Sequence, residues 1–547
     1  FFILLGACLF NLQIVRGSLY KDLSYKNSIR LLSIAAPRGT VYDRHGKVTA
    51  DNALSFGVFI VPQEAKDLDA EIEKLSEILD VPESLLKRNY KRSYHAPFAP
   101  CEVMGNVPKK KAILIEELKL DMPGVLIKEM PLRRYAYKEA LAHILGYVGE
   151  IDKKELASLK SYGYSVKDLI GKDGMEKVMD AVLRGRSGGM QVQVDNRGRQ
   201  VKVLNFKGPK KGNDIHLTID AGLQDFVWRM MKDKMGAVVF MDPHTGEILT
   251  MISAPSYDPN DSVIKLLNDA AAPLLNRSIM GQYPPGSLFK IVVAMAGLET
   301  GKLHQAKTFF CSGKLNVGAG RFNCWNRDGH GAMDLEMGII QSCNVYFYNV
   351  GMLVGMEKIC EYARQFGFGR KTGIGLFGEE EGFVPSRAWK RAEKKGRWYA
   401  GDTANLSIGQ GYLLVTPLQV VRLVSCIANG GVLVEPYILK GAAGGHTKTD
   451  LRLKKKNIDL VKKGMKGVVE ADGGTGFRAW SSVVSISAKT GTAQAGGSLK
   501  SHAWFAGFAP SDDPKISFVI FLEHGGSGGG VAAMIAKKAV EYWYKNR

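Results

Sequence analysis

The sequence predicts an α+β fold in which helices cover an antiparallel sheet assembled from both ends of one domain. Residues 236–252 form two apolar strand-like runs separated by a short turn, which is typical of a hairpin. Three further strand-like runs come much later, at 483–492, 503–510 and 516–522, and an amphipathic helix is expected at 531–544. Because the chain between these groups is mainly helical in pattern, we expect a five-stranded antiparallel sheet with helices packed on it.

The chain opens with an apolar segment, residues 1–17, which we interpret as the distal part of an uncleaved membrane anchor. Its run of about fifteen apolar-dominated residues is shorter than the roughly 20 that cross a bilayer. A cleaved signal sequence and a buried helix are the alternatives, but no small-residue cleavage site follows the segment. Basic residues between Arg16 and Arg30 come next, and the sequence leaves the orientation of the anchor open.

A long N-terminal unit, residues 18–205, is expected between the anchor and the sheet-containing domain. Within it, residues from about 55 to 133 are lysine-rich and biased toward helix, which predicts a small α/β insert that could serve as a docking surface. The Gly-, Pro- and Lys-rich stretch Lys202–Asn213 indicates a boundary. The second domain is therefore expected to span 206–547.

Composition narrows the function classes. The 547 residues are 45% hydrophobic and 23% charged, which is ordinary for globular domains and excludes a disordered chain. The formal net charge of +20 indicates an anionic neighbour such as a phospholipid surface or an acidic polymer. No zinc-finger spacing, RNA-recognition signature or basic helix favours nucleic acid as that neighbour. Seven cysteines, an odd number, exclude a framework in which every cysteine is paired within the chain.

The strongest candidate for a nucleophile is Ser287, which follows Pro284-Pro285-Gly286 at the start of an apolar helix. Lys290 lies three residues further, so the two side chains share one face of the helix. A serine hydroxyl needs a base, and a lysine serves as that base only when burial or a nearby positive charge lowers its pKa. Taken alone, the motif is common, and an N-cap serine with a solvated lysine is the simpler interpretation.

Two later motifs change that balance. Ser342-Cys343-Asn344 places a hydroxyl and an amide beside a buried segment, and Lys489-Thr490-Gly491-Thr492 ends a strand-like run in which the glycine lets a ligand approach the backbone. The set S-x-x-K, S-x-N and K-T-G, in that chain order, is typical of class A β-lactamases and penicillin-binding proteins. The second motif is usually S-D-N in these families. Here Cys343 replaces the aspartate, and Asn344 occupies the third position.

With these motifs, the chain resembles a class B penicillin-binding protein, a membrane-anchored peptidoglycan DD-transpeptidase. The resemblance extends over Arg38–Arg44, the Gly174-x-Glu176 region and Trp504–Pro510. Within the class it most resembles the elongation-type class 2 members, because of the blocks between Phe310 and Tyr348. The resemblance implies a serine β-lactamase-like transpeptidase domain on an elongated α/β pedestal of the dimerisation type. It also implies a single-pass anchor in the cytoplasmic (inner) membrane, with the catalytic domain on the periplasmic side.

The resemblance further implies roles for the motif residues. Ser287 attacks the carbonyl between two D-alanines of a stem peptide, and Lys290, kept neutral by the crowding Lys489, takes its proton. Ser342 relays a proton to the leaving D-alanine, and Asn344 holds a substrate amide. Lys489, Thr490 and Thr492, which surround Gly491, contact the terminal carboxylate. The backbone N–H groups of Ser287 and Thr492 form the oxyanion hole.

The implied partners are peptidoglycan stem peptides or their lipid-linked precursor, β-lactam antibiotics, the membrane, a polytopic glycan polymerase and other elongation proteins. Four alternatives share the motifs: a division-type transpeptidase, a serine β-lactamase, a β-lactam sensor or scaffold, and a hydrolytic carboxypeptidase. A β-lactamase needs a further base for deacylation, usually a glutamate, and the sequence does not identify one.

No cofactor is expected, although one region is rich in metal-type ligands: Cys311, Cys324, Asp328, His330 and Cys343. Zinc bound by thiolate and imidazole is chemically sensible. The spacing matches no compact zinc pattern, so a redox-labile Cys311–Cys324 disulfide or free thiols are favoured over a structural zinc.

Overall fold

The computed structural model describes residues 1–164, 168–195, 200–318, 320–441, 447–495 and 499–547. The chain divides into two compact units. Unit 1 comprises residues 1–41, 50–136 and 180–214, and unit 2 comprises 42–49, 137–179 and 215–547. Both units are therefore discontinuous in sequence, which the linear domain division at 205/206 did not anticipate.

Unit 1 begins with helical segments: α1 (Phe2–Phe10), η1 (Asn11–Val15) and α2 (Gly17–Ser28). The apolar side chains of α1 are exposed, with Phe2 87% accessible. In the described part of the chain, no helix is both long enough and apolar enough to cross a membrane.

Two sheets form the rest of unit 1. In the first, β1 (Ile29–Ile34), β8 (Gly188–Val194) and β9 (Gln200–Lys207) are antiparallel in the order β1-β8-β9. The predicted division at 205/206 falls inside β9, which pairs with β8, and the units divide at 214/215, next to the end of the predicted boundary stretch Lys202–Asn213.

In the second sheet of unit 1, β3 (Val48–Ile60) pairs with β4 (Cys101–Val107) and β5 (Val125–Tyr135). Three helices accompany these strands, namely α3 (Leu68–Leu79), α4 (Glu83–Ser93) and α5 (Lys109–Glu117). Their apolar faces close one core with the sheet. The predicted α/β insert at 55–133 corresponds to these strands and helices.

Unit 2 is organised around a five-stranded antiparallel sheet with the order β12-β11-β21-β20-β19. The strands are β11 (Gly236–Met241), β12 (Ile248–Ala254), β19 (Ser487–Ala493), β20 (His502–Ala509) and β21 (Ile516–Leu522). Every residue of β11, β12 and β21 is buried, since both faces of the sheet are covered. The strand predicted from residue 483 begins at 487, and β19 is an edge strand.

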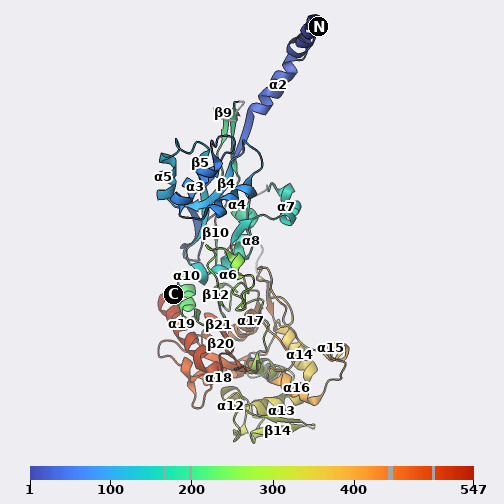
Figure 1. Ribbon diagram of the computed structural model, residues 1–547. Coiled ribbons are helices and arrows are strands. Elements are labelled where there is room, and N and C mark those ends of the chain that lie inside the picture. Colours follow the sequence, from blue (N-terminus) through green and yellow to red (C-terminus); the bar gives the residue numbers. More distant parts are fainter. Residues whose placement is uncertain (165–167, 196–199, 319, 442–446, 496–498) are drawn as a thin grey trace. The chain divides into compact units, whose positions relative to one another are not determined.

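Helices cover the two faces of this sheet (Figure 1). On one face, α10 (Ala221–Met231) and α19 (Ala533–Asn546) share a core with the strands, including Val227, Phe518 and Val540. Against β11, β20 and β21 packs α17 (Pro417–Ala428), in which every residue is buried. Next to β19 lies α18 (Lys455–Glu470).

The helical middle of unit 2 joins the early and late strands. It contains η5 (Gly286–Phe289), α11 (Lys290–Glu299), α12 (Leu335–Ile340), α13 (Asn344–Val354), α14 (Met356–Gln365), α15 (Arg387–Glu393) and α16 (Ala400–Ser407). Short strands interrupt it: β13 (Phe309–Cys311) pairs with β16 (Gly331–Met333), and β14 (Lys314–Val317) pairs with β15 (Gly320–Asn323). Nine of the ten residues of α11 are buried, as its apolar run predicts.

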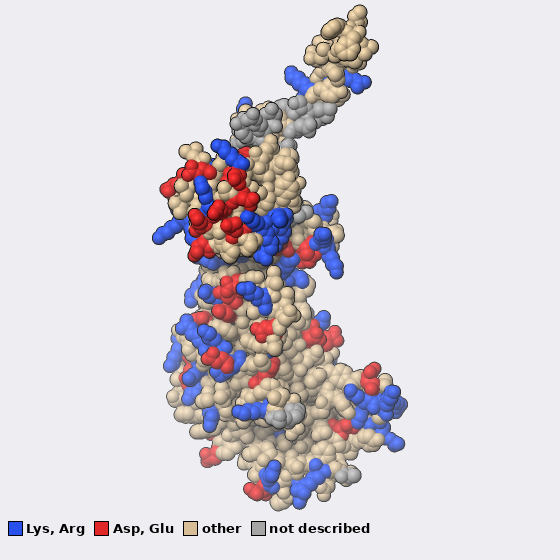
Figure 2. Space-filling view, in the orientation of Figure 1, with Lys and Arg blue, Asp and Glu red and all other residues tan. Residues whose placement is uncertain are grey.

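The remaining elements are short. They are β2 (Val41–Tyr42), η2 (Lys138–Ala140), α6 (Ala142–Leu145), β6 (Val148–Glu150), α7 (Lys153–Leu159), η3 (Lys160–Tyr162), β7 (Leu169–Gly171), α8 (Gly174–Val178), α9 (Asp180–Leu183), β10 (Ile215–His216), η4 (Val263–Leu266), β17 (Val432–Val434), β18 (Lys448–Asp450), η6 (Phe477–Ala479) and η7 (Gly528–Ala532). On the face drawn in Figure 2, lysines and arginines alternate with acidic residues within each unit, so the positive charge forms no single continuous patch there.

Candidate active site

Ser287 lies on a tight helical turn, η5, directly before the buried helix α11. Gly286 precedes it with a φ of +55°, a conformation that favours glycine. A Cβ atom at Gly286 would lie 2.8 Å from the carbonyl oxygen of Thr492 on β19. Glycine at this position therefore allows the nucleophile turn to pack against the edge strand.

Two fully buried lysines converge on Ser342. The Nζ of Lys290 donates hydrogen bonds to the Ser342 carbonyl oxygen at 2.8 Å and to the Asn344 Oδ1 at 2.7 Å. A longer contact of 3.3 Å joins it to the Ser342 hydroxyl. Lys489 Nζ reaches the same hydroxyl at 2.8 Å. The three motifs thus meet at the Ser342 hydroxyl, whereas the sequence had predicted a meeting point at the Ser287 oxygen.

Burial determines the protonation of these lysines. Both are 0% exposed, and loss of hydration disfavours an ammonium group. Burial lowers the pKa of Lys290 to about 8. The pKa of Lys489 lies well below its usual value because of burial and, secondarily, the charge of Lys290. Sequence reasoning named both a buried setting and crowding by Lys489 as causes for Lys290, and the structure makes burial the main one.

The second motif forms the sharp entry to α13. Ser342 has a φ of +53°, which is uncommon for a residue other than glycine and is often found at functional sites. Cys343 follows as the N-cap, and its Sγ accepts a hydrogen bond from the backbone N–H of Tyr346. Asn344 is the first residue of the helix. This turn places the Ser342 hydroxyl and the Asn344 amide on the same side.

A cleft of about 850 Å³ opens over these groups. Its lining includes Ser287, Ser342, Asn344, Thr490 and Thr492. Within the described ranges, the Ser287 hydroxyl makes no hydrogen bond with another side chain, so it is available to a ligand in the cleft.

In the third motif, Thr490 and Gly491 have neighbours that the sequence did not predict. The Thr490 hydroxyl lies 2.8 Å from that of Thr475, a partner that sequence reasoning missed. Gly491 is buried, and a Cβ atom there would lie 2.9 Å from the Trp504 Cβ and 3.1 Å from the Pro285 carbonyl oxygen. Gly491 therefore serves the packing of the nucleophile loop, whereas we had expected it to admit a ligand.

Other cleft residues were also missed by sequence reasoning. Arg321, Phe322 and Trp325 come from the β14–β15 hairpin and its exit, and Asn405 and Gln410 come from the end of α16. The Gly-Gln-Gly run at 409–411 was an available signal, because both glycines have positive φ and shape the turn.

Four metal-type ligands gather beside the second motif. The donor atoms of Cys311, Cys324, His330 and Cys343 all lie within 4.8 Å of one another. The Sγ atoms of Cys311 and Cys324 are each 3.5 Å from His330 Nδ1. Asp328 is not part of this group, and the Cys311–Cys324 disulfide is not formed because both residues are free thiols.

The chemistry of this donor set fits a metal. Three thiols and one imidazole in a compact, mostly buried group are a donor set used by structural Zn²⁺. The His330 Nδ1 faces the sulfur atoms of Cys311 and Cys324, so this nitrogen could join them in binding a metal. Sequence reasoning judged the ligand spacing along the chain, whereas the loops between the ligands bring them together in space.

Two family models match this chain. The penicillin-binding protein transpeptidase domain matches residues 236–541, and the penicillin-binding protein dimerisation domain matches residues 33–217. Peptidoglycan D,D-transpeptidase MrdA of Haemophilus influenzae is 33% identical over 579 residues, covering 98% of this chain and 89% of the relative.

Solved structures agree with this match. The penicillin-binding protein PBP2 of Helicobacter pylori, in its complex with MreC, is similar with a TM-score of 0.83 and 30% identity, covering 94% of this chain and 99% of that one. A chain from a peptidoglycan synthase complex that coordinates polymerization and crosslinking has a TM-score of 0.77 and 28% identity, covering 100% and 96%. With its three motifs converging in one cleft, the chain belongs to the class B penicillin-binding proteins and is most similar to their elongation-type members.

Proposed function

We propose that this protein is a peptidoglycan D,D-transpeptidase that crosslinks stem peptides during cell elongation and is acylated by β-lactams at Ser287. The observation that carries the proposal is the meeting of Lys290 and Lys489 at the Ser342 hydroxyl, beneath a cleft that exposes Ser287. Family membership and the activity named for the relatives support the same reaction.

Lys290 is the proposed base. With a pKa of about 8, about a tenth of Lys290 is neutral at pH 7 and about half at pH 8. A neutral amine has two N–H groups, which suffice for its two short hydrogen bonds to the Ser342 carbonyl and Asn344. The lone pair is then left for the Ser287 proton. Ser287 Oγ attacks the carbonyl between the two terminal D-alanines and forms an acyl ester.

The backbone N–H groups of Ser287 and Thr492 donate hydrogen bonds to the oxyanion that forms in this step. Thr492 lies on edge strand β19, whose outer side has no neighbouring strand in the described sheet. Such an edge can pair with an extended peptide and present a donor to the reacting carbonyl. Loss of one such donor typically lowers kcat about 10²- to 10³-fold.

The leaving group and the acceptor use the same side chains. Ser342 passes the proton taken by Lys290 to the nitrogen of the departing D-alanine, since its hydroxyl contacts both lysines. Lys489, Thr490 and Thr492 donate hydrogen bonds to the terminal carboxylate, whose negative charge favours the protonated form of Lys489. Asn344 Nδ2 is offered to a substrate carbonyl. The amine of a second stem peptide then attacks the ester, forms the crosslink and returns a proton to Ser287.

We further propose that Zn²⁺ is held by Cys311, Cys324, His330 and Cys343. Bound zinc would crosslink the segments around it and so stabilise the fold locally. Cys343 links the cluster to catalysis through the chain, because it lies between Ser342 and Asn344 and caps α13.

Membrane attachment and partners are proposed on the same basis. The exposed apolar residues of α1 support a role for residues 1–17 in a single-pass anchor, with the catalytic domain on the periplasmic side of the inner membrane. The Helicobacter pylori relative binds MreC, and another similar chain belongs to a complex that combines polymerization with crosslinking. We therefore assign this chain a polytopic glycan polymerase and other elongation proteins as partners.

A specific observation disfavours the β-lactamase alternative. None of the residues that line the cleft in the described structure carries a carboxylate, so a glutamate that activates a deacylating water is missing from this lining. The acyl-enzyme is accordingly expected to persist with β-lactams, in which the leaving group stays tethered to the acyl moiety.

Labelling with fluorescent penicillin, followed by peptide mapping, tests the proposal. The label is expected on Ser287, and Ser287→Ala is expected to abolish it. Ser501→Ala, which removes another hydroxyl from the cleft lining, is the matched control and should retain labelling. Labelling of Ser287→Ala at another residue would refute the assignment.

A further inference from the structure

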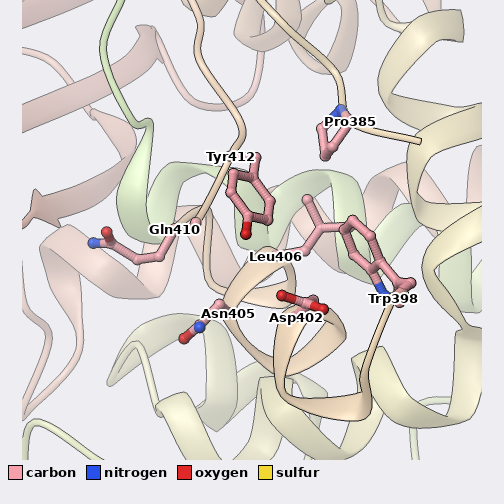
Figure 3. A pocket seen from close by; sticks show the side chains of 8 residues that line it. Pro385, Trp398, Asp402, Asn405, Leu406, Gln410 and Tyr412 are labelled. Atoms are coloured by element: carbon pink, nitrogen blue, oxygen red, sulfur yellow. The ribbon is translucent and has the colours of Figure 1, made fainter. Parts of the chain in front are cut away.

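A second pocket of about 250 Å³ lies beside the catalytic cleft. Its lining comprises Pro385, Trp398, Asp402, Asn405, Leu406, Gln410, Gly411 and Tyr412 (Figure 3). We propose that this pocket is a subsite for a stem peptide and binds the uncharged backbone amides of a strand whose reacting end lies at Ser287. This inference rests on the proposed transpeptidase function and extends it to substrate residues beyond the reacting bond.

Two residues connect the pocket to the cleft. Asn405 and Gln410 line both cavities, so a peptide bound in the cleft can continue past them into the pocket. In Figure 3 the side chains of Asn405 and Gln410 lie on one side of the pocket, whereas Trp398 lies on the other. A peptide entering from the cleft would therefore meet the two amides first and the apolar and aromatic lining afterwards.

The electrostatics of the pocket favour a neutral ligand. Asp402 is the only charged residue in its lining, and Lys390 donates a hydrogen bond to that carboxylate. Lys390 is itself buried, and its Nζ lies 5.1 to 5.8 Å from the ring centroids of Trp398, Tyr399 and Tyr412. Because the ion pair is already neutralised and enclosed, a charged ligand gains little there.

The available hydrogen-bonding groups match a peptide backbone. Across the described residues, the side-chain amides of Asn405 and Gln410 and the hydroxyl of Tyr412 make no hydrogen bond within the protein. Each amide offers both donors and an acceptor, which is the complement of a peptide group. The half-buried ring of Tyr412 can contact a small alkyl side chain between such contacts.

The turn that carries the two amides is fixed relative to Ser287. The Gln410 N–H donates to the Asn405 carbonyl at 3.0 Å, which closes the turn after α16. The Gly286 N–H donates to the Gly409 carbonyl at 3.0 Å, one residue before the nucleophile. Peptide bound to these amides would thus be held in a defined register with Ser287, which is the kind of positioning that accelerates a bimolecular reaction.

Blocking the pocket in an already folded protein tests this inference. In a Cys8→Ser background the other six native cysteines are buried, so Tyr412→Cys introduces a selectively reactive thiol. The same preparation is assayed before and after reaction with N-ethylmaleimide. The probes are fluorescent penicillin, a stem pentapeptide ending in D-alanyl-D-alanine as donor, and an amine-bearing stem tetrapeptide as acceptor.

We expect maleimide at position 412 to slow peptide crosslinking about tenfold or more relative to penicillin acylation. Slower formation of the peptide acyl-enzyme identifies the donor as occupant, whereas slower transfer to the amine alone identifies the acceptor. Tyr362→Cys, at a similarly half-buried tyrosine on α14, is the matched control and should show no change in this ratio.

Two results would overturn the subsite: unchanged crosslinking after labelling, or an equal loss of penicillin acylation and crosslinking, which would indicate an effect on the nucleophile turn. If Tyr412→Cys does not fold, Tyr412→Phe removes only the hydroxyl and should slow crosslinking severalfold relative to penicillin acylation, and an unchanged ratio would overturn the subsite. Failure of the unlabelled Cys8→Ser protein to bind penicillin at Ser287 would instead contradict the proposed function.

Discussion

Replacing Gly409 by alanine should slow acylation strongly without a large loss of stability. Gly409 has a φ of +71°, and a Cβ atom there would lie 2.1 Å from the Gly286 carbonyl oxygen. A carbon and a carbonyl oxygen approach no closer than about 3.3 Å even in favourable contacts. The peptide group before Ser287 must therefore retreat by about 1.2 Å.

The magnitude follows from that displacement. The left-handed conformation costs an alanine about 1–2 kcal/mol. A shift of about 1 Å in a catalytic group can lower the rate about 10²-fold. Gly409→Ala is thus expected to acylate about 100-fold more slowly than wild type.

Gly430→Ala separates the two effects. Gly430 has a φ of +89°, and a Cβ atom there would have no other atom within 4 Å. This control bears the conformational cost alone and should keep the wild-type acylation rate. The assay is the second-order rate of fluorescent-penicillin labelling, with unfolding in urea as the stability measurement. Wild-type labelling by a folded Gly409→Ala protein would refute the reasoning.

Three further outcomes are expected. The acylation rate should rise with pH and level off above about 8, because Lys290 accepts a proton only after losing its own; a rate independent of pH from 6 to 9 would contradict this. Cys311→Ser should lower zinc content by mass spectrometry and the Tm, whereas Cys101→Ser, a buried cysteine outside the cluster, should leave zinc content unchanged. Glu523→Ala should lower the unfolding free energy by about 3 kcal/mol, because the buried Arg277 loses its ionic partner; a change under about 1 kcal/mol in urea denaturation would argue otherwise.

Much of the fold was predictable because its signals are local. Apolar strand-like runs marked the strands of the unit 2 sheet, and the apolar run after Lys290 marked the buried helix α11. Ser287 and Lys290 are joined by one turn, so their spacing alone predicted a shared face. The division at 205/206 was placed too early, because the pairing of β9 with β8 is not visible in the sequence, although the boundary stretch that ends at Asn213 lies next to the observed division at 214/215.

The spacing of the cysteines in the sequence did not reveal that they lie close together in space. A metal site requires its donors to be near one another in space, and the β14–β15 hairpin separates Cys311 from Cys324 without moving them apart. The position of the Asn405 and Gln410 amides was also not predictable from the sequence, because only the packing of their turn on Gly286 brings them near the nucleophile.

The sequence by itself determined which residue types carry the chemistry and in what order the motifs follow along the chain. This is because the reactivity of a hydroxyl or an amine depends first on its covalent structure. Only the tertiary structure decided how those groups behave. Lys489 and Ser342 are 147 residues apart, and their contact exists because the sheet and the helices close around both. The same closure removes water from Lys290 and lowers its pKa, an effect that depends on every surrounding atom and on no single motif.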